Sequence, residues 1–177
     1  MNAKLKSKLK NCRLLVTDVD GVLTDGKITY SSAGEELKSF HIHDGLGLKL
    51  IQNAGLQTAI ITGRASPMVE RRAKELGIEH LVQGREDKDV ALSALCEELG
   101  IPLEQTIYLG DDLPDLKAIN TAGIGAAPAD ANSVIKKNAD YCCNLRGGKG
   151  AVREVCELIL EAKGLLSELH TTYGSQA

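Results

Sequence analysis

Two closely spaced carboxylates follow a short apolar run near the beginning of the sequence. Asp18 and Asp20 come directly after residues 13–17, and an apolar run that ends in acids and glycine predicts a buried strand leading into a loop. In phosphoryl transfer a carboxylate can act as the nucleophile and form an aspartyl-phosphate. A second carboxylate nearby can protonate the leaving oxygen and then activate water. We therefore interpret Asp18 as a candidate nucleophile and Asp20 as a candidate acid and base.

Other polar side chains come shortly after the remaining apolar runs. They are Thr62, Gly63 and Arg64 after residues 57–61, Lys88 after residues 80–82, and Asp111, Asp112 and Asp115 after residues 106–109. In an open parallel sheet, ligands bind beyond the carboxyl ends of the strands, so these side chains are expected to converge there. Thr62 can donate to a phosphoryl oxygen, and Lys88 can offset charge on the nucleophile and the phosphoryl group. Arg64 can bind a carboxylate or phosphate of the substrate.

The clustering of carboxylates favours a divalent cation at the same place. Carboxylates that share a site repel one another unless a cation neutralises them. Oxygen ligands without paired histidines suit Mg²⁺. We expect Asp18, Asp20 and Asp111 to bind Mg²⁺, with Asp112 and Asp115 supporting these ligands through hydrogen bonds. For Asp115 the alternative is an acid at the start of a helix, where the helix dipole favours negative charge.

Strands and helices that alternate along the chain are predicted to position these residues. Predicted strands cover residues 13–17, 57–61, 80–82, 106–109, 124–127 and 140–143, and predicted helices cover 44–53, 67–76, 88–99, 113–121, 131–137 and 151–163. This alternation predicts the α/β class, with a Rossmann-like parallel sheet and helices on both faces. We expect a single domain over residues 1–177, with a mobile tail over about 165–177 because the last residues are small and polar.

A small β-hairpin is the predicted element that departs from this alternation. Residues 27–30 and 36–40 alternate around a turn that contains glycine, which indicates a hairpin flap over about 26–41. Only this hairpin and one helix fit between Asp20 and Thr62, and only a helix and a strand fit between Thr62 and Lys88. The sequence therefore predicts no cap domain, and a site without a cap needs another cover against water.

The composition limits the class of partner and the compartment. The net charge is −3 and no basic block covers a face, so no nucleic-acid partner is expected. The longest apolar runs have the length of strands, and no signal sequence follows the N-terminal lysines, so no membrane segment is expected. The 5 cysteines lack the spacing of a disulfide framework or a zinc site. We expect reduced thiols and a cytoplasmic location.

The ordered motifs resemble those of the haloacid dehalogenase superfamily of phosphatases. The matching residues are Asp18-Val19-Asp20-Gly21-Val22, Thr62, Lys88 and Gly110-Asp111-Asp112-Leu113-Pro114-Asp115. Further segments resemble the capless subgroup that acts on 3-deoxy-D-manno-octulosonate 8-phosphate: Leu23-Thr24-Asp25-Gly26, Lys38-Ser39-Phe40, Asp44-Gly45-Leu46-Gly47, Thr62-Gly63-Arg64 and Gly147-Gly148-Lys149-Gly150-Ala151-Val152-Arg153-Glu154. The likeness extends from about residue 13 to about residue 163.

This resemblance implies a reaction, a cofactor and an assembly. It implies Mg²⁺-dependent hydrolysis of that sugar-acid phosphate in lipopolysaccharide biosynthesis, by a homotetramer in which a neighbouring subunit covers the site. It also implies that the substrate contacts Thr24, His43, Asp44, Gly63 and Arg64. His43 stands where the pattern of the subgroup has an arginine, so this sequence departs from the subgroup in its means of sugar recognition.

Two alternatives remain open from the sequence. A phosphatase for sialic-acid-type 9-phosphates would use the same catalytic residues; Arg64 favours the octulosonate subgroup, and His43 weakens that preference. A phospho-acceptor receiver domain also carries acids, a threonine and a lysine at strand ends and has no cap. A receiver has no use for Asp20 as the acid for a leaving group, which favours a phosphatase.

Overall fold

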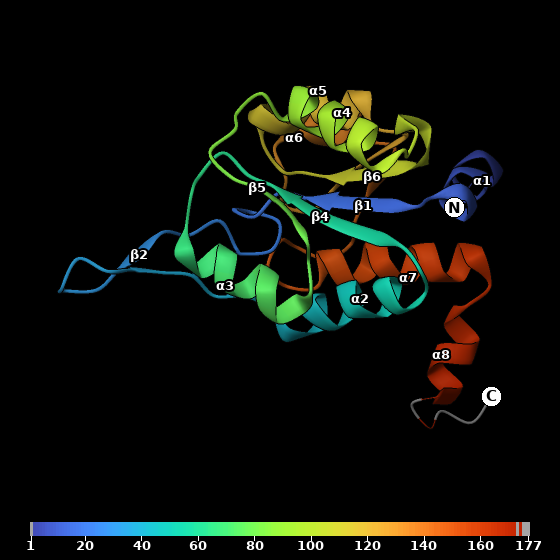
Figure 1. Ribbon diagram of the computed structural model, residues 1–177, viewed down its shortest axis with the longest axis horizontal. Coiled ribbons are helices and arrows are strands. Elements are labelled where there is room, and N and C mark those ends of the chain that lie inside the picture. The colour runs from blue at the N-terminus through green and yellow to red at the C-terminus, as the bar shows by residue number, and fades with distance from the viewer. Residues whose placement is uncertain (1, 173, 175–177) are drawn as a thin grey trace.

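A six-stranded parallel sheet forms the centre of the computed structural model, which describes residues 2–172 and residue 174 (Figure 1). Its strands lie in the order β5-β4-β1-β6-β7-β8, and each neighbouring pair is parallel. Their bounds are β1 Leu14–Thr17, β4 Gln57–Ile61, β5 His80–Val82, β6 Thr106–Leu109, β7 Ile124–Ala127 and β8 Tyr141–Cys142. This arrangement confirms the predicted α/β class and places β1 between β4 and β6.

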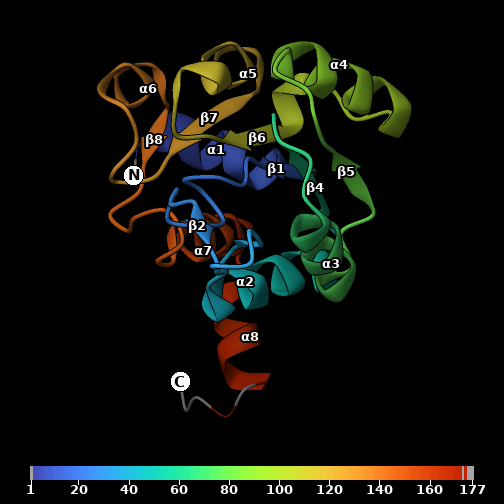
Figure 2. The ribbon, with the colours of Figure 1, turned by 90° about the vertical axis from the view of Figure 1, so that its left-hand side faces the viewer.

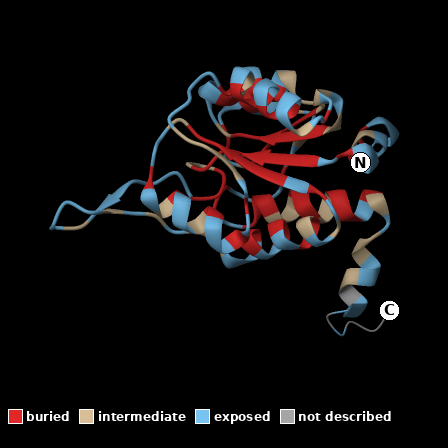
Figure 3. Cartoon of the chain, viewed as in Figure 1, coloured by how far each residue is buried: buried red, intermediate tan, exposed pale blue. Residues whose placement is uncertain are grey.

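Helices cover both faces of the sheet, as Figure 2 shows. One layer contains α1 (Ala3–Asn11), α2 (Ile42–Asn53), α3 (Pro67–Leu76) and α7 (Ala151–Lys163), and the other contains α4 (Lys88–Leu99), α5 (Leu116–Thr121) and α6 (Ser133–Asn138). Because successive side chains of a strand point to opposite faces, Leu15 of β1 joins the first layer, whereas Leu14 and Val16 join the second. All three are buried, as is expected for a sheet covered on both sides. Figure 3 shows the central strands mostly in the colour of buried residues.

The predicted hairpin is present, but its strands are short. β2 (Thr29–Tyr30) and β3 (Glu36–Leu37) pair antiparallel. The hairpin projects from the rest of the protein in Figure 1 and is mostly exposed in Figure 3. A two-stranded ribbon without a third strand is marginally stable, which explains why pairing does not extend over the predicted segments 27–30 and 36–40.

Some helix boundaries differ from the prediction for local reasons. α2 begins before the predicted residue 44, because the ring of His41 accepts a hydrogen bond from the backbone N–H of His43 and caps the helix. α6 begins after the predicted residue 131, because the side chain of Asn132 accepts a hydrogen bond from the N–H of Val134. A 3₁₀ turn precedes α5 in place of one continuous helix; the 3₁₀ turns are Leu103–Gln105 and Leu113–Asp115.

The C-terminal segment contains a helix where the sequence predicts a mobile tail over about 165–177. α8 (Leu166–Thr172) follows α7, and Leu165, Leu166 and Leu169 pack against the core layer that contains α7. These apolar contacts stabilise the segment, whereas the prediction rests on the small polar residues at the end of the chain. Residues 173 and 175–177 of that tail lie outside the described residues. Among the described helices, none has the length and apolar character needed to cross a membrane.

A buried carboxylate joins α2 to α7. Asp44 of α2 is 1% exposed and accepts hydrogen bonds from the backbone N–H groups of Arg153 (2.8 Å) and Gly150 (3.3 Å). It therefore caps the N-terminus of α7, where unpaired N–H groups and the helix dipole favour an anion. The sequence predicts a substrate contact for Asp44, but in the structure both of its oxygens bind the backbone of α7.

We expect Asp44→Ala to lower the free energy of unfolding by about 2 kcal/mol, because two N–H groups at the start of α7 lose their buried acceptor. Urea unfolding followed by circular dichroism measures this change. The control Asp25→Ala removes an exposed acid that pairs with Lys27 and should change stability by less than about 0.5 kcal/mol. An equally small change for Asp44→Ala, accompanied by a raised KM, would instead indicate that Asp44 binds the substrate.

Candidate active site

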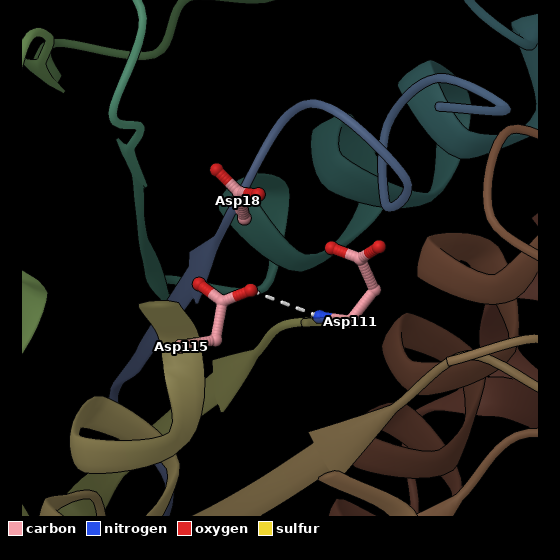
Figure 4. A group of neighbouring side chains, drawn as sticks. All are labelled: Asp18, Asp111 and Asp115. Atoms are coloured by element: carbon pink, nitrogen blue, oxygen red, sulfur yellow. Dashed lines mark hydrogen bonds between the residues drawn. The ribbon is translucent and has the colours of Figure 1, made fainter. Parts of the chain in front are cut away.

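The carboxyl ends of β1 and β6 bring three carboxylates together (Figure 4). Asp18 directly follows β1, while Asp111 and Asp115 follow β6, which is its neighbour in the sheet. One carboxylate oxygen of each residue lies within 4.8 Å of the other two. The convergence of Asp18 and Asp111 is thus as predicted, because parallel strands end at the same edge of the sheet.

Burial and mutual repulsion disfavour the ionised form of this group. Burial and the charge of Asp115 raise the pKa of Asp18 to about 6, although Lys88 opposes this shift. Burial, Asp115 and Asp18 raise the pKa of Asp111 to about 7. Burial lowers the pKa of Lys88, but the charges of Asp18 and Asp115 outweigh it, so its pKa is raised and the ammonium group stays charged. A bound cation would offset the excess negative charge.

Asp115 uses both of its oxygens within the protein. Oδ1 accepts hydrogen bonds from Nζ of Lys88 (2.6 Å) and from the hydroxyl of Tyr108 (2.8 Å). Oδ2 accepts hydrogen bonds from the backbone N–H groups of Asp111 (3.0 Å, dashed in Figure 4) and Asp112 (3.3 Å). Asp115 therefore holds Lys88 and the loop that carries Asp111. The sequence reasoning missed Tyr108, although a tyrosine within a buried strand signals a hydroxyl that needs a partner.

The side chain of Asp112 accepts hydrogen bonds from Leu113 and Asn132. Its Oδ1 accepts hydrogen bonds from the N–H of Leu113 (2.8 Å) and the side-chain amide of Asn132 (3.0 Å). The backbone N–H of Asn132 in turn donates to the carbonyl of Asp111 (2.8 Å). Asp112 thus supports the backbone of the loop around Asp111. None of these hydrogen bonds involves the carboxylate of Asp111.

The donor set of the carboxylate group fits Mg²⁺. Its atoms are carboxylate oxygens, which are the hard ligands that Mg²⁺ prefers. Oδ1 of Asp18 is buried and accepts no hydrogen bond from the described residues; Nζ of Lys88 lies 3.1 Å away as an ion pair without hydrogen-bond geometry. Because Asp115 already accepts four hydrogen bonds, Asp18 and Asp111 are the members of the group that would hold the ion.

Asp20 lies among cations instead. Its carboxylate accepts a hydrogen bond from Lys38, whose side chain is 2% exposed, and lies 3.8 Å from Nε of Arg64. Nη2 of Arg64 also lies 2.8 Å from Oε2 of Glu36 in the hairpin. The predicted metal contact of Asp20 and substrate contact of Arg64 stay predictions, because both side chains have partners within the protein. Lys38 was missed because no local pattern reveals where the base of the hairpin lies.

Thr62 follows β4, the neighbour of β1 in the sheet, and Lys88 begins α4. Thr62 is buried directly after β4, and its backbone N–H donates to the carbonyl of Val82 (2.9 Å) in β5. Lys88 is the first residue of α4 and its side chain extends to Asp18. A Cβ atom on Gly63 would lie 3.7 Å from the side chain of Glu86, which is an ordinary van der Waals contact. Thr62 and Gly63 therefore follow the end of β4, while Lys88 extends from α4 to the carboxylate at the end of β1.

Close backbone contacts shape the loop after Asp18. Gly21 has φ of +92°, and a Cβ atom there would collide with the carboxylate of Asp111. A Cβ atom on Gly147 would likewise collide with the carbonyl of Gly21. The N–H of Gly148 donates to the carbonyl of Val22 (2.9 Å). The segment before α7 thus supports the loop that carries the candidate nucleophile, and glycine is required where the backbones touch.

Two predicted substrate contacts, Thr24 and His43, have neighbours within their own segments. The buried hydroxyl of Thr24 donates to the carbonyl of Val19 (3.3 Å) and accepts from the N–H of Gly26 (3.3 Å), so it closes the loop after Asp18. His43 is exposed on α2, with its ring edge-on to that of His41 at a centroid distance of 4.8 Å. Among the described residues neither side chain hydrogen-bonds to the carboxylate group, so both substrate contacts stay predictions.

Comparison with known proteins finds relatives along nearly the whole chain. A sequence profile described as haloacid dehalogenase-like hydrolase matches residues 80–153. The 3-deoxy-D-manno-octulosonate 8-phosphate phosphatase KdsC of Haemophilus influenzae is 43% identical over 170 residues, which cover 96% of this chain and 94% of that protein. The chain belongs to the 3-deoxy-D-manno-octulosonate 8-phosphate phosphatase family. Another member, from Escherichia coli K12, is 46% identical over 168 residues, covering 95% of this chain and 89% of that protein.

Solved structures of this phosphatase family share the fold. The enzyme from Moraxella catarrhalis, in complex with magnesium, phosphate and KDO, is 47% identical, with a TM-score of 0.95 and coverage of 98% of this chain and 99% of that chain. The cobalt-bound enzyme from Haemophilus influenzae is 44% identical, with a TM-score of 0.90 and coverage of 94% and 98%. The family resemblance and the fold predicted from the motifs are therefore confirmed.

Without added metal, we expect the protein to lose stability as the pH rises from about 5 to about 8. Folding raises the pKa of Asp18 to about 6 and that of Asp111 to about 7. Between the ordinary carboxyl pKa of 3.8 and these values the folded state binds more protons than the unfolded state, so stability falls as the pH rises through this range. Mg²⁺ needs ionised carboxylates and should raise Tm more at about pH 8 than at about pH 5.

Thermal unfolding at both pH values, with and without Mg²⁺, measures this dependence. Asp111→Asn should weaken the effect of Mg²⁺ on Tm, because it removes one candidate ligand. Asp25→Asn, a change at an exposed acid of the same loop as Asp18, should leave it intact. An equal rise of Tm at both pH values would contradict metal binding by the carboxylate group.

Proposed function

We propose that this protein is a Mg²⁺-dependent phosphomonoesterase that hydrolyses 3-deoxy-D-manno-octulosonate 8-phosphate to the free sugar acid and phosphate. The observation that carries the proposal is the arrangement of Asp18, Asp111 and Lys88 at the edge of the sheet, in a chain that matches this phosphatase family over 96% of its length. The related structure that contains magnesium, phosphate and KDO supports the same substrate. The proposal includes a role in lipopolysaccharide biosynthesis in the cytoplasm, within one catalytic domain.

Asp18 is the proposed nucleophile. Nζ of Lys88, 3.1 Å from its Oδ1, stabilises the ionised carboxylate, which attacks phosphorus while the bond from phosphorus to the sugar oxygen breaks. This step leaves an aspartyl-phosphate and a sugar oxygen that needs a proton. When held by Asp18 and Asp111, Mg²⁺ supplies positive charge beside the phosphoryl oxygens. Thr62 and Lys88 would bind the same oxygens.

Asp20 is the proposed acid and base. It lies on the same loop as Asp18 and, in its protonated form, would give a proton to the leaving sugar oxygen. It would then take a proton from the water that attacks the aspartyl-phosphate, which releases phosphate and restores Asp18. Lys38 and Arg64 hold the carboxylate of Asp20 beside the hairpin in the structure, so we infer that the hairpin orients the acid.

Sugar recognition is assigned to the exposed side of the site. We propose that Arg64, whose side chain is 43% exposed, binds the carboxylate of the substrate next to Gly63. His43 would contact the anionic substrate when protonated. Thr24 and Asp44 are assigned to holding the loop and α7, because their polar atoms already have partners.

A neighbouring subunit is proposed to cover the site. Large apolar side chains are exposed on the hairpin and at the start of α2, namely Ile28, Tyr30, Leu37 and Ile42. A group of this kind on a soluble surface is typical of a protein contact. We propose a homotetramer, as the family resemblance implies, in which this surface joins subunits and the contact excludes water from the carboxylate group.

With Mg²⁺, we expect kcat/KM for 3-deoxy-D-manno-octulosonate 8-phosphate to exceed that for a sialic-acid-type 9-phosphate by about tenfold or more, since the site would hydrogen-bond the shorter sugar acid. Phosphate release over a range of concentrations measures both values, and omission of Mg²⁺ gives the background. A higher value for the nine-carbon substrate would overturn the substrate assignment but keep the reaction. Transfer of a single phosphoryl group without turnover would indicate a receiver domain.

Asp20→Asn should slow the hydrolysis of alkyl phosphates by about 10²-fold or more. It should slow the hydrolysis of aryl phosphates by much less, because their leaving groups need less protonation. Phosphate release from a series of esters with different leaving-group pKa values measures the difference. Asp25→Asn is the control and should leave all rates unchanged. An equal loss for all esters would exclude Asp20 as the acid.

A further inference from the structure

Lys88 forms ion pairs with two carboxylates. Its Nζ lies 2.6 Å from Oδ1 of Asp115 and 3.1 Å from Oδ1 of Asp18, and its side chain is 4% exposed. The proposed function needs the ammonium group at Asp18 and at the phosphoryl oxygens, so a stronger attraction to Asp115 would work against the reaction. The balance between these two contacts therefore depends on what else binds Asp115.

The hydroxyl of Tyr108 is the other donor to the same oxygen. Tyr108 lies in β6, is 0% exposed and donates to Oδ1 of Asp115 at 2.8 Å. Burial and the neighbouring carboxylates of Asp115 and Asp18 raise the pKa of Tyr108 well above its usual value, so the hydroxyl keeps its proton and remains a donor. Its ring lies in the apolar layer with Val16 and Ile61, where a phenylalanine would pack as well. Packing alone therefore does not explain the hydroxyl.

We propose that Tyr108 is a positioning residue for the nucleophile. Its hydroxyl occupies one acceptor direction of Oδ1 of Asp115 and takes up part of its charge, which fixes the direction from which Lys88 approaches and leaves the ammonium group within reach of Asp18. Without the hydroxyl, Asp115 would draw Lys88 further from Asp18. This inference rests on the proposed function, because it assigns the effect of Tyr108 to phosphoryl transfer.

Tyr108→Phe should lower kcat by about tenfold, the size expected for one hydrogen bond to a charged group, and leave KM within about twofold. The matched control is Tyr141→Phe. The hydroxyl of Tyr141 also donates to a carboxylate at 2.8 Å, that of Glu154, and belongs to β8, away from the carboxylate group. It should leave kcat unchanged. Equal kcat values for the two variants, or a raised KM with an unchanged kcat for Tyr108→Phe, would overturn the proposal.

A second comparison separates positioning from a structural role. In an Asp115→Asn background that circular dichroism shows to be folded, Tyr108→Phe should cause no further loss of kcat beyond about twofold, because its effect passes through Asp115. A full further loss would overturn the proposal. A crystal structure of Tyr108→Phe gives a test without that background: the distance from Nζ of Lys88 to Oδ1 of Asp18 should exceed about 3.5 Å, and an unchanged distance would overturn the proposal.

The kinetic comparison should use both the sugar-acid phosphate and an aryl phosphate with Mg²⁺. If the wild-type protein turns over only the aryl phosphate, the proposed substrate fails, while the ratio of Tyr108→Phe to wild type still tests the positioning role. If the wild-type protein turns over neither ester, the proposed function fails, and the Lys88 distance in the crystal structure decides about Tyr108. The two proposals can thus fail separately.

Discussion

The buried ion pairs of Lys88 with Asp18 and Asp115 hold the candidate site together. Three carboxylates at one edge of the sheet repel one another, and a single ammonium group offsets only part of their charge. The remaining negative charge disfavours the metal-free protein near neutral pH, yet it is also what makes the place attractive to a divalent cation. Stability and function therefore oppose each other here, as they commonly do at active sites.

The fold supplies each member of this network from a different element. β1 and β6 deliver Asp18 and Asp111 because they are neighbours in the sheet, and α4 delivers Lys88 from its first turn. The backbone of the loop after β6 is tied to Asp115, so the strand, the loop and the turn before α5 form one unit. In the layer that contains α2 and α7, Asp44 fixes the start of α7. The short loop that carries Asp18 is thus surrounded by helices and strands. Such support suits a site that must hold charged side chains in fixed positions.

Much of the fold could be predicted from the sequence because its signals are local. β4, α3, α4, β6, β7 and α7 have the predicted bounds. For α3 and α4 the reason is visible, since Gly77 and Gly100 end these helices in the left-handed conformation. The sequence predicts the extent of the hairpin poorly, and it predicts a mobile tail in place of α8, because the extent of a two-stranded ribbon and the docking of this helix depend on contacts between distant segments.

The candidate site also has features that the sequence predicts and features that it does not. Positions at strand ends predict that Asp18 and Asp111 meet, because the order of a parallel sheet implies it. The partners of a side chain follow no such rule. The ion pair between Lys38 and Asp20 depends on the orientation of the hairpin relative to the sheet. The hydrogen bond from Tyr108 to Asp115 depends on the conformation of the turn before α5. Neither relation has a signature in spacing or composition.

The contact of Gly147 and Gly148 with Gly21 and Val22 bears on how the protein is made. The loop that carries Asp18 leaves the ribosome well before the backbone against which it rests. Strand β6, which brings Asp111, is also synthesised after β1. During synthesis the early carboxylates therefore have neither their support nor their metal-binding partner. A product that ends before residue 111 would therefore carry the candidate nucleophile without Asp111, and one that ends before residue 147 would carry it without the backbone support of its loop.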